Sequence, residues 1–316
     1  MNCRFALWVL AVGSSLQWCL KEEFTQEDQV YSVDYSADGT MYAVGLKNKK
    51  TIIYQASDQM EVYSYTTDKE PFSLEFNYLS DKLIVGYDQK YTIVDLTVDP
   101  ITKTDTSVGF KINDIDCHSS QNLVVFCGDD KKFRVSDGTT TTTSSDVGSA
   151  ILSCQFVPGS TDVLIGCDDG RTYLYSSPYT SSSSSTDFGD KVLDIAFRDG
   201  SSTVYLVAEE ADSASLSSPS TVIGTDGKTY TCSYAASNDF FMFAGESGKT
   251  YIYNATDQNN TSVQTFDNTN GKKLWSSDFS DDGNYLLVGC EDEKLYIYTR
   301  NCINCLYGYF LNYTSL

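Results

Sequence analysis

The chain has little histidine, few basic residues and no long apolar run. Its 316 residues include one histidine and 22 Lys and Arg against 43 Asp and Glu, for a formal charge of −21. Nucleic-acid binding is disfavoured, because neutralising phosphates needs clustered Lys and Arg. An anionic membrane surface is disfavoured for the same reason. The longest N-terminal apolar run, Phe5–Val12, is too short to span a membrane.

Catalytic and cofactor signatures are also scarce. A Ser-His-Asp or Cys-His arrangement needs a base beside its nucleophile, and His118 follows Cys117 in what we expect to be a solvated turn. Cys302 and Cys305 supply only two of the four ligands of a zinc site. No Gly-rich phosphate loop joins a strand to a helix. We therefore expect no enzyme activity and no cofactor.

A repeat of about 40 residues organises the chain from Val30 onward. One marker sits near the end of the first strand of each unit and is aromatic with one exception: Tyr35, Phe76, Cys117, Phe156, Phe197, Tyr234 and Phe279. A second marker, a small residue, ends the second strand: Gly45, Gly86, Gly128, Gly166, Ala208, Gly245 and Gly289. Seven copies at this period, with three or four strands each, predict an all-β, seven-bladed β-propeller over residues 21–300.

The units resemble degenerate WD40 repeats. The segments DFSDDGNYLLVGCEDEKLYIYT (278–299) and VDYSADGTMYAVG (33–45) have that family's strand, Asp-Gly turn and second strand ending in Gly. No unit has the Gly-His dipeptide, and Tyr or an aliphatic residue replaces the Trp of Trp-Asp. The resemblance implies the propeller architecture without the family's hydrogen-bond tetrad. It also implies one possible function, that of an intracellular assembly scaffold.

The two ends of the chain carry separate hypotheses. Residues 1–20 read either as a secretory signal or as a ring-closing strand, Leu16–Phe24, beside Leu295–Tyr298. That strand would bring Cys19 near Cys302 or Cys305, and we predict a disulfide there. The tail 301–316 resembles the start of a cysteine-rich repeat of the furin or growth-factor-receptor type.

Four carboxylates recur at one position of the first, channel-side strand. They are Asp34, Glu75, Asp116 and Asp278. Buried carboxylates need partners or a cation. We expect hydrogen bonds to neighbouring backbone or channel water, and keep a Ca²⁺ site as the alternative.

Four sequons complete the sequence-level picture, at Asn254, Asn259, Asn260 and Asn312. They favour a secreted or cell-surface, non-enzymatic glycoprotein that presents propeller loops to a protein or glycan partner, and self-association is possible. Two alternatives stay open. One is the intracellular scaffold, and the other is a propeller glycosidase that uses two channel carboxylates.

Overall fold

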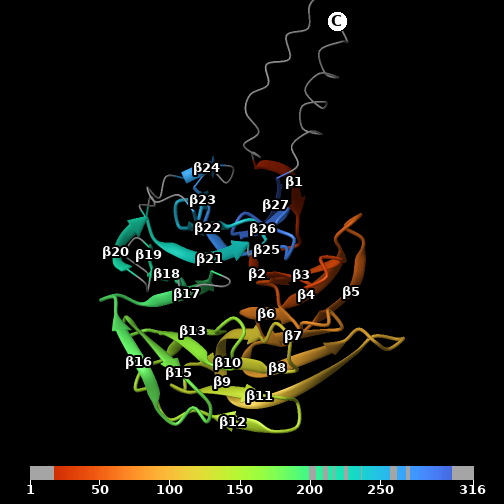
Figure 1. The fold of residues 1–316 in the computed structure, drawn as a ribbon. Coiled ribbons are helices and arrows are strands. Elements are labelled where there is room, and N and C mark those ends of the chain that lie inside the picture. Colours follow the sequence, from red (N-terminus) through yellow and green to blue (C-terminus); the bar gives the residue numbers. More distant parts are fainter. Residues whose placement is uncertain are drawn as a thin grey trace, which may run out of the picture.

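The structure is a computed structural model, and it describes residues 18–198, 204–208, 213–215, 218–223, 227–235, 237–256, 262–267 and 271–300. Its strands form antiparallel sheets arranged in a ring, and each blade has one strand near the centre and its fourth strand outside (Figure 1). Within these ranges the sheets make seven blades, so the fold is the predicted all-β, WD40-like propeller. The described part of the chain contains no helix of the length and hydrophobicity needed to cross a membrane.

The blades follow one another along the chain. Blade 1 contains β2 (Val30–Tyr35), β3 (Met41–Leu46), β4 (Lys50–Gln55) and β5 (Glu61–Thr66). Blade 2 contains β6 (Ser73–Phe76), β7 (Lys82–Gly86), β8 (Asp88–Asp95) and the first half of β9 (Thr102–Cys117). Blade 3 contains the second half of β9, β10 (Val124–Gly128), β11 (Phe133–Ser136) and β12 (Thr141–Thr143). Blade 4 contains β13 (Ile151–Phe156), β14 (Val163–Cys167), β15 (Arg171–Tyr175) and β16 (Ser182–Asp187).

The second half of the ring has the same order. Blade 5 contains β17 (Val192–Phe197), β18 (Val204–Ala208), β19 (Ser213–Ser215) and β20 (Ser218–Ile223). Blade 6 contains β21 (Thr229–Ala235), β22 (Phe240–Gly245), β23 (Lys249–Asn254) and β24 (Ser262–Asp267). Blade 7 contains β25 (Leu274–Phe279), β26 (Tyr285–Cys290), β27 (Lys294–Thr299) and β1 (Cys19–Thr25).

One strand, β9, belongs to two blades. It pairs with β8 through residues 102–111 and with β10 through residues 112–117, which joins blades 2 and 3 in a single 7-stranded sheet. From the repeat pattern we predict an outer strand at Thr102–Val108 and a separate inner strand after it, and this boundary is wrong. Gly109 has a φ of 81°, a conformation that glycine adopts freely, so the strand continues through this position.

The first and last described strands close the ring. β1 runs antiparallel to β27, from Cys19 opposite Thr299 to Thr25 opposite Lys294. Trp18 is fully buried beside it, with its ring 6.1 Å from Phe240 and 5.5 Å from Phe279. This is the pairing expected for the N-terminal strand. Residues 1–17 and 301–316, which carry the signal and cysteine-rich predictions, lie outside the described residues.

The small residue at the end of each second strand allows neighbouring blades to approach. A Cβ on Gly289 in blade 7 would lie 2.6 Å from Val30 Cγ1 in blade 1. A Cβ on Gly86 in blade 2 would lie 2.7 Å from Ile112 Cγ2 in blade 3. Both positions lie where apolar side chains of one blade are buried against the next. The repeat marker is therefore a packing requirement of the interface between blades.

Candidate functional site

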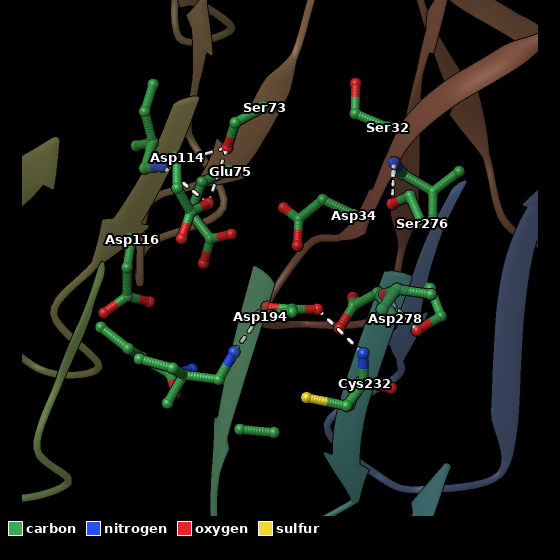
Figure 2. Close-up of a pocket in the computed structure, with 18 of the residues that line it drawn as sticks. Ser32, Asp34, Ser73, Glu75, Asp114, Asp116, Asp194, Cys232, Ser276 and Asp278 are labelled. Atoms are coloured by element: carbon green, nitrogen blue, oxygen red, sulfur yellow. Dashed lines mark hydrogen bonds between the residues drawn. The ribbon is translucent and has the colours of Figure 1, made fainter. Parts of the chain in front are cut away.

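A cavity of about 340 Å³ lies where the inner strands meet. Equivalent positions of all seven inner strands line it, because these strands run in the same direction around the ring. Its carboxylates include the four predicted channel residues and two more: Asp34, Glu75, Asp114, Asp116, Asp194 and Asp278. Several of them point towards the same central space (Figure 2). Among the described residues that line the cavity, none is Lys, Arg or His.

Three of the predicted carboxylates accept a backbone hydrogen bond from the next blade and so join the two blades. We call such a contact a clip. Asp278 Oδ2 in blade 7 accepts a hydrogen bond from Tyr35 N in blade 1, at 2.8 Å. The same contact recurs between Asp34 and Phe76 N at 2.6 Å, and between Asp116 and Phe156 N at 2.7 Å. Each inner strand is an edge strand whose N–H groups need a partner. The expected hydrogen bonding to neighbouring backbone is therefore what the structure shows for these three.

A second tier of clips lies two residues earlier in the inner strands. Asp114 accepts a hydrogen bond from Cys154 N at 2.9 Å, and Asp194 accepts one from Cys232 N at 2.9 Å. Serines take the equivalent place in other blades, as where Ser276 Oγ accepts from Val33 N at 2.9 Å. This tier is absent from the sequence predictions. The signal was available, because Ser, Thr or Asp stands at this offset in every unit.

Glu75 is the one predicted channel carboxylate that does not join two blades. Its carboxylate makes no hydrogen bond to another described residue. Burial raises the pKa of Glu75 well above its usual range, and the charges of Asp34, Asp116 and Asp278 raise it further. Glu75 thus contributes to the channel an acidic group without a hydrogen-bond partner among the described residues, whereas its neighbours hold the ring together.

The remaining channel carboxylates are also weakened as acids. Burial is the largest cause in each case, because it penalises the charged form. It raises the pKa of Asp114 to about 6, of Asp194 and Asp278 to about 7 and of Asp116 to about 8. The pKa of Asp34 is also raised well above its usual range, by burial and then by the charge of Asp278. The channel therefore changes its charge across neutral pH.

A collar of larger side chains surrounds one end of this cavity. Its members are Tyr31, Phe72, Asn113, Leu152, Leu193, Tyr230 and Trp275. Apart from Phe72, each is the extra residue of a β-bulge: Tyr31, for example, lies between Val30, paired with Leu46, and Ser32, paired with Gly45. A bulge re-aims a side chain away from the regular alternation. The collar was not predicted from the sequence.

Aromatic rings make up much of the collar. Tyr230 and Trp275 are stacked with centroids 5.1 Å apart, and Tyr31 meets Trp275 edge-on at 6.0 Å. Lys273 Nζ lies 5.4 Å from the Trp275 centroid, and Lys111 Nζ lies 4.3 Å from that of Phe72. The collar therefore already contacts cations, although neither lysine lines the cavity.

The other predicted site residues divide into described and undescribed positions. Asp34, Glu75, Asp116 and Asp278 share the cavity, but no three His, Cys, Asp or Glu side chains of the described residues are grouped to hold a metal ion. The cation site stays a prediction. Cys19 Sγ donates to Thr299 O at 3.6 Å. Its proposed partners, Cys302 and Cys305, lie outside the described residues, as do three sequons, at Asn259, Asn260 and Asn312.

His118 differs from the prediction. It is 2% exposed rather than solvated. Its Nδ1 accepts a hydrogen bond from Ser120 N at 3.1 Å, and its ring lies edge-on to Phe156 with centroids 5.3 Å apart. Asn77 in blade 2 occupies the same place after the inner strand and accepts from Lys82 N at 2.9 Å. His118 is therefore a buried residue that organises the following turn.

Comparison with known proteins gives one family match. Residues 260–299, which contain most of blade 7, match the WD domain, G-beta repeat family. No curated protein matches the chain. A WD40 repeat is a unit of protein-interaction scaffolds, which are usually non-catalytic, and this supports a binding role for the propeller.

Proposed function

We propose that the chain is a non-enzymatic scaffold, secreted or at the cell surface, that binds a protein or glycan partner at the collar end of its channel. The carrying observation is the collar itself. Six bulges direct larger side chains to one end of a 340 Å³ cavity. The aromatic members of the collar are half-buried, and aromatic groups beside polar ones at a cavity are typical of binding sites.

A sequon supports the secreted location. Asn254 ends β23 and is half-buried, and its Oδ1 accepts hydrogen bonds from Thr256 N at 2.8 Å and Thr256 Oγ1 at 2.6 Å. Thr256 is exposed, so this sequon lies at the surface of the propeller. The predicted signal, the link from Cys19 to the tail and the cysteine-rich start of residues 301–316 belong to the same proposal. The intracellular scaffold is the competing location.

The contacts of the channel carboxylates argue against the glycosidase alternative. That chemistry needs two carboxylates free to act as acid and nucleophile or base. Asp34, Asp116 and Asp278, like Asp114 and Asp194, accept backbone hydrogen bonds that join blades. Glu75 alone is left without such a role among the described carboxylates of the cavity.

The location is tested by producing the full chain in cells that secrete glycoproteins. N-terminal sequencing is expected to find a start near residues 14–16, and intact mass is expected to fall on deglycosylation and change on reduction. Glycan mass on the 251–266 peptide would support the proposal. An intact Met1 with free thiols and no glycan would select the intracellular scaffold instead.

The binding face is tested by photo-crosslinking in the cells that make the protein. A photoreactive amino acid replaces Phe72 in the collar, and in a matched variant it replaces Leu79. Leu79 is 59% exposed in the turn after β6, at the opposite end of that strand. We expect a discrete crosslinked partner from position 72 only. Equal crosslinking from both positions would contradict a collar-centred site.

A further inference from the structure

Among the described residues that line it, the channel gathers acidic side chains and no basic ones. Six carboxylates line the cavity, and among the described lining residues no Lys, Arg or His faces them. Five accept backbone hydrogen bonds, which stabilise a carboxylate without neutralising it. The carboxylate of Glu75 accepts no hydrogen bond from another described residue. A cation from outside would stabilise the ionised form of these carboxyl groups, which burial and their mutual repulsion disfavour in its absence.

The predicted channel carboxylates lie in blades 7, 1, 2 and 3. The inner strands of blades 4 and 6 have hydrogen-bond acceptors without partners among the described residues. Ser233 in blade 6 takes the position of Asp278, is 8% exposed and lines the cavity. Its Oγ has no hydrogen-bond partner among the described residues, and neither has Gln155 Oε1 at the same position in blade 4. Buried polar atoms without partners are rare in native proteins. Trp275 Nε1 is unpartnered too, and as a donor it would stay so beside a cation.

These features select one kind of ligand. A guanidinium group carries five N–H donors and no acceptor, keeps its charge at all relevant pH values and binds carboxylates through two parallel hydrogen bonds. It also stacks on aromatic rings and is more weakly hydrated than an ammonium group. The aromatic rings of the collar match the stacking. The acceptor atoms of Ser233 and Gln155 match the N–H donors, and the carboxylate of Glu75 matches the positive charge.

We propose that the channel binds an alkylguanidinium cation, which passes the aromatic collar and lies against Glu75. The cation is the arginine side chain of a partner protein or a free small molecule. This inference rests on the proposed function, because it names the chemistry recognised at the same site.

Calorimetric titration of the full chain with butylguanidinium, near pH 8 and at moderate salt, tests the proposal. Butylurea, which is neutral and of similar shape, is the comparison ligand. We expect saturable binding of butylguanidinium alone, weakened at least tenfold by Glu75→Gln. Glu61→Gln, which removes one charge from the exposed outer strand β5, is expected to leave binding unchanged. Equal affinity in Glu75→Gln and wild type, or equal binding of butylurea, would overturn the proposal.

Glu75→Gln is a suitable variant because the Glu75 carboxylate joins no blades, and a melting temperature no lower than that of wild type verifies its fold. The source of the cation is resolved with a peptide holding one arginine among glycines. Tighter binding than butylguanidinium selects a protein side chain, and exclusion of the peptide selects a small molecule. If butylguanidinium fails while crosslinking at position 72 persists, only this inference falls. If both fail, the proposed function falls with it.

Discussion

The ring is expected to lose stability as pH rises through neutrality, and Asp194 provides a sharp test. Burial raises the pKa of Asp194 from 3.8 to about 7. The folded chain therefore holds this proton more tightly than the unfolded chain. The resulting stability is fully present below about pH 4 and is lost as pH rises through about 7. Sealed from water, the effect would be ~4 kcal/mol. Because Asp194 is half-buried beside the channel, we expect ~1–2 kcal/mol.

The assay is urea denaturation of wild type and Asp194→Asn near pH 5 and near pH 8.5. Asparagine keeps an oxygen that can accept from Cys232 N but cannot ionise. Part of this effect is already lost at pH 5. The free energy of unfolding of Asp194→Asn is therefore expected to change between the two pH values by ~1 kcal/mol less than that of wild type. The other channel carboxylates keep part of the slope.

Asp187→Asn is the matched control. Asp187 is exposed, and hydrogen bonds from Gly189 N and Arg171 lower its pKa below 3.8. Its stabilising contribution is lost only as pH falls below that range, so its substitution leaves the slope between pH 5 and 8.5 unchanged. Identical slopes in Asp194→Asn and wild type, or a wild-type stability that rises with pH in this window, would refute the reasoning.

Three further predictions concern packing. Gly289→Ala should lower the free energy of unfolding by ~1–3 kcal/mol, because the new methyl would overlap Val30, and an unchanged urea midpoint would contradict this. Trp18→Ala should cost ~3–5 kcal/mol by emptying the space beside β1, and a smaller loss in calorimetry would show that ring closure does not depend on it. His118→Asn should be tolerated, since Asn77 organises the equivalent turn, whereas His118→Ala should cost ~1–2 kcal/mol; equal melting temperatures for the two variants would argue against the turn contact.

Local sequence pattern was enough to predict the blades. In residues 274–299 the three expected strands correspond to β25, β26 and β27. Alternating apolar residues set the strands, and turns containing Asp and Gly end them, so both signals lie within a few residues. The repeat also places a polar tract, residues 181–186, at an outer-strand position, and the structure has β16 there, at Ser182–Asp187.

Features that depend on pairing between distant residues were not predictable in the same way. A bulge exists only relative to the partner strand, so nothing in the composition of Tyr230 or Trp275 reveals that they are extra residues in the pairing. The continuous β9 was missed because Gly109 resembles a strand end until its neighbours on both sides are known. The burial of His118 was missed because its contact with Phe156 is formed by the next blade.

The bulges have a consequence for how this protein can change over time. A bulged residue is skipped in the pairing of its strand with the next, while the residues on either side keep their partners. Its side chain can therefore be exchanged with little effect on the sheet, whereas the clip residues beside it cannot. Recognition and architecture are thus encoded at adjacent but separate positions, and related chains could acquire new ligands by altering the collar alone.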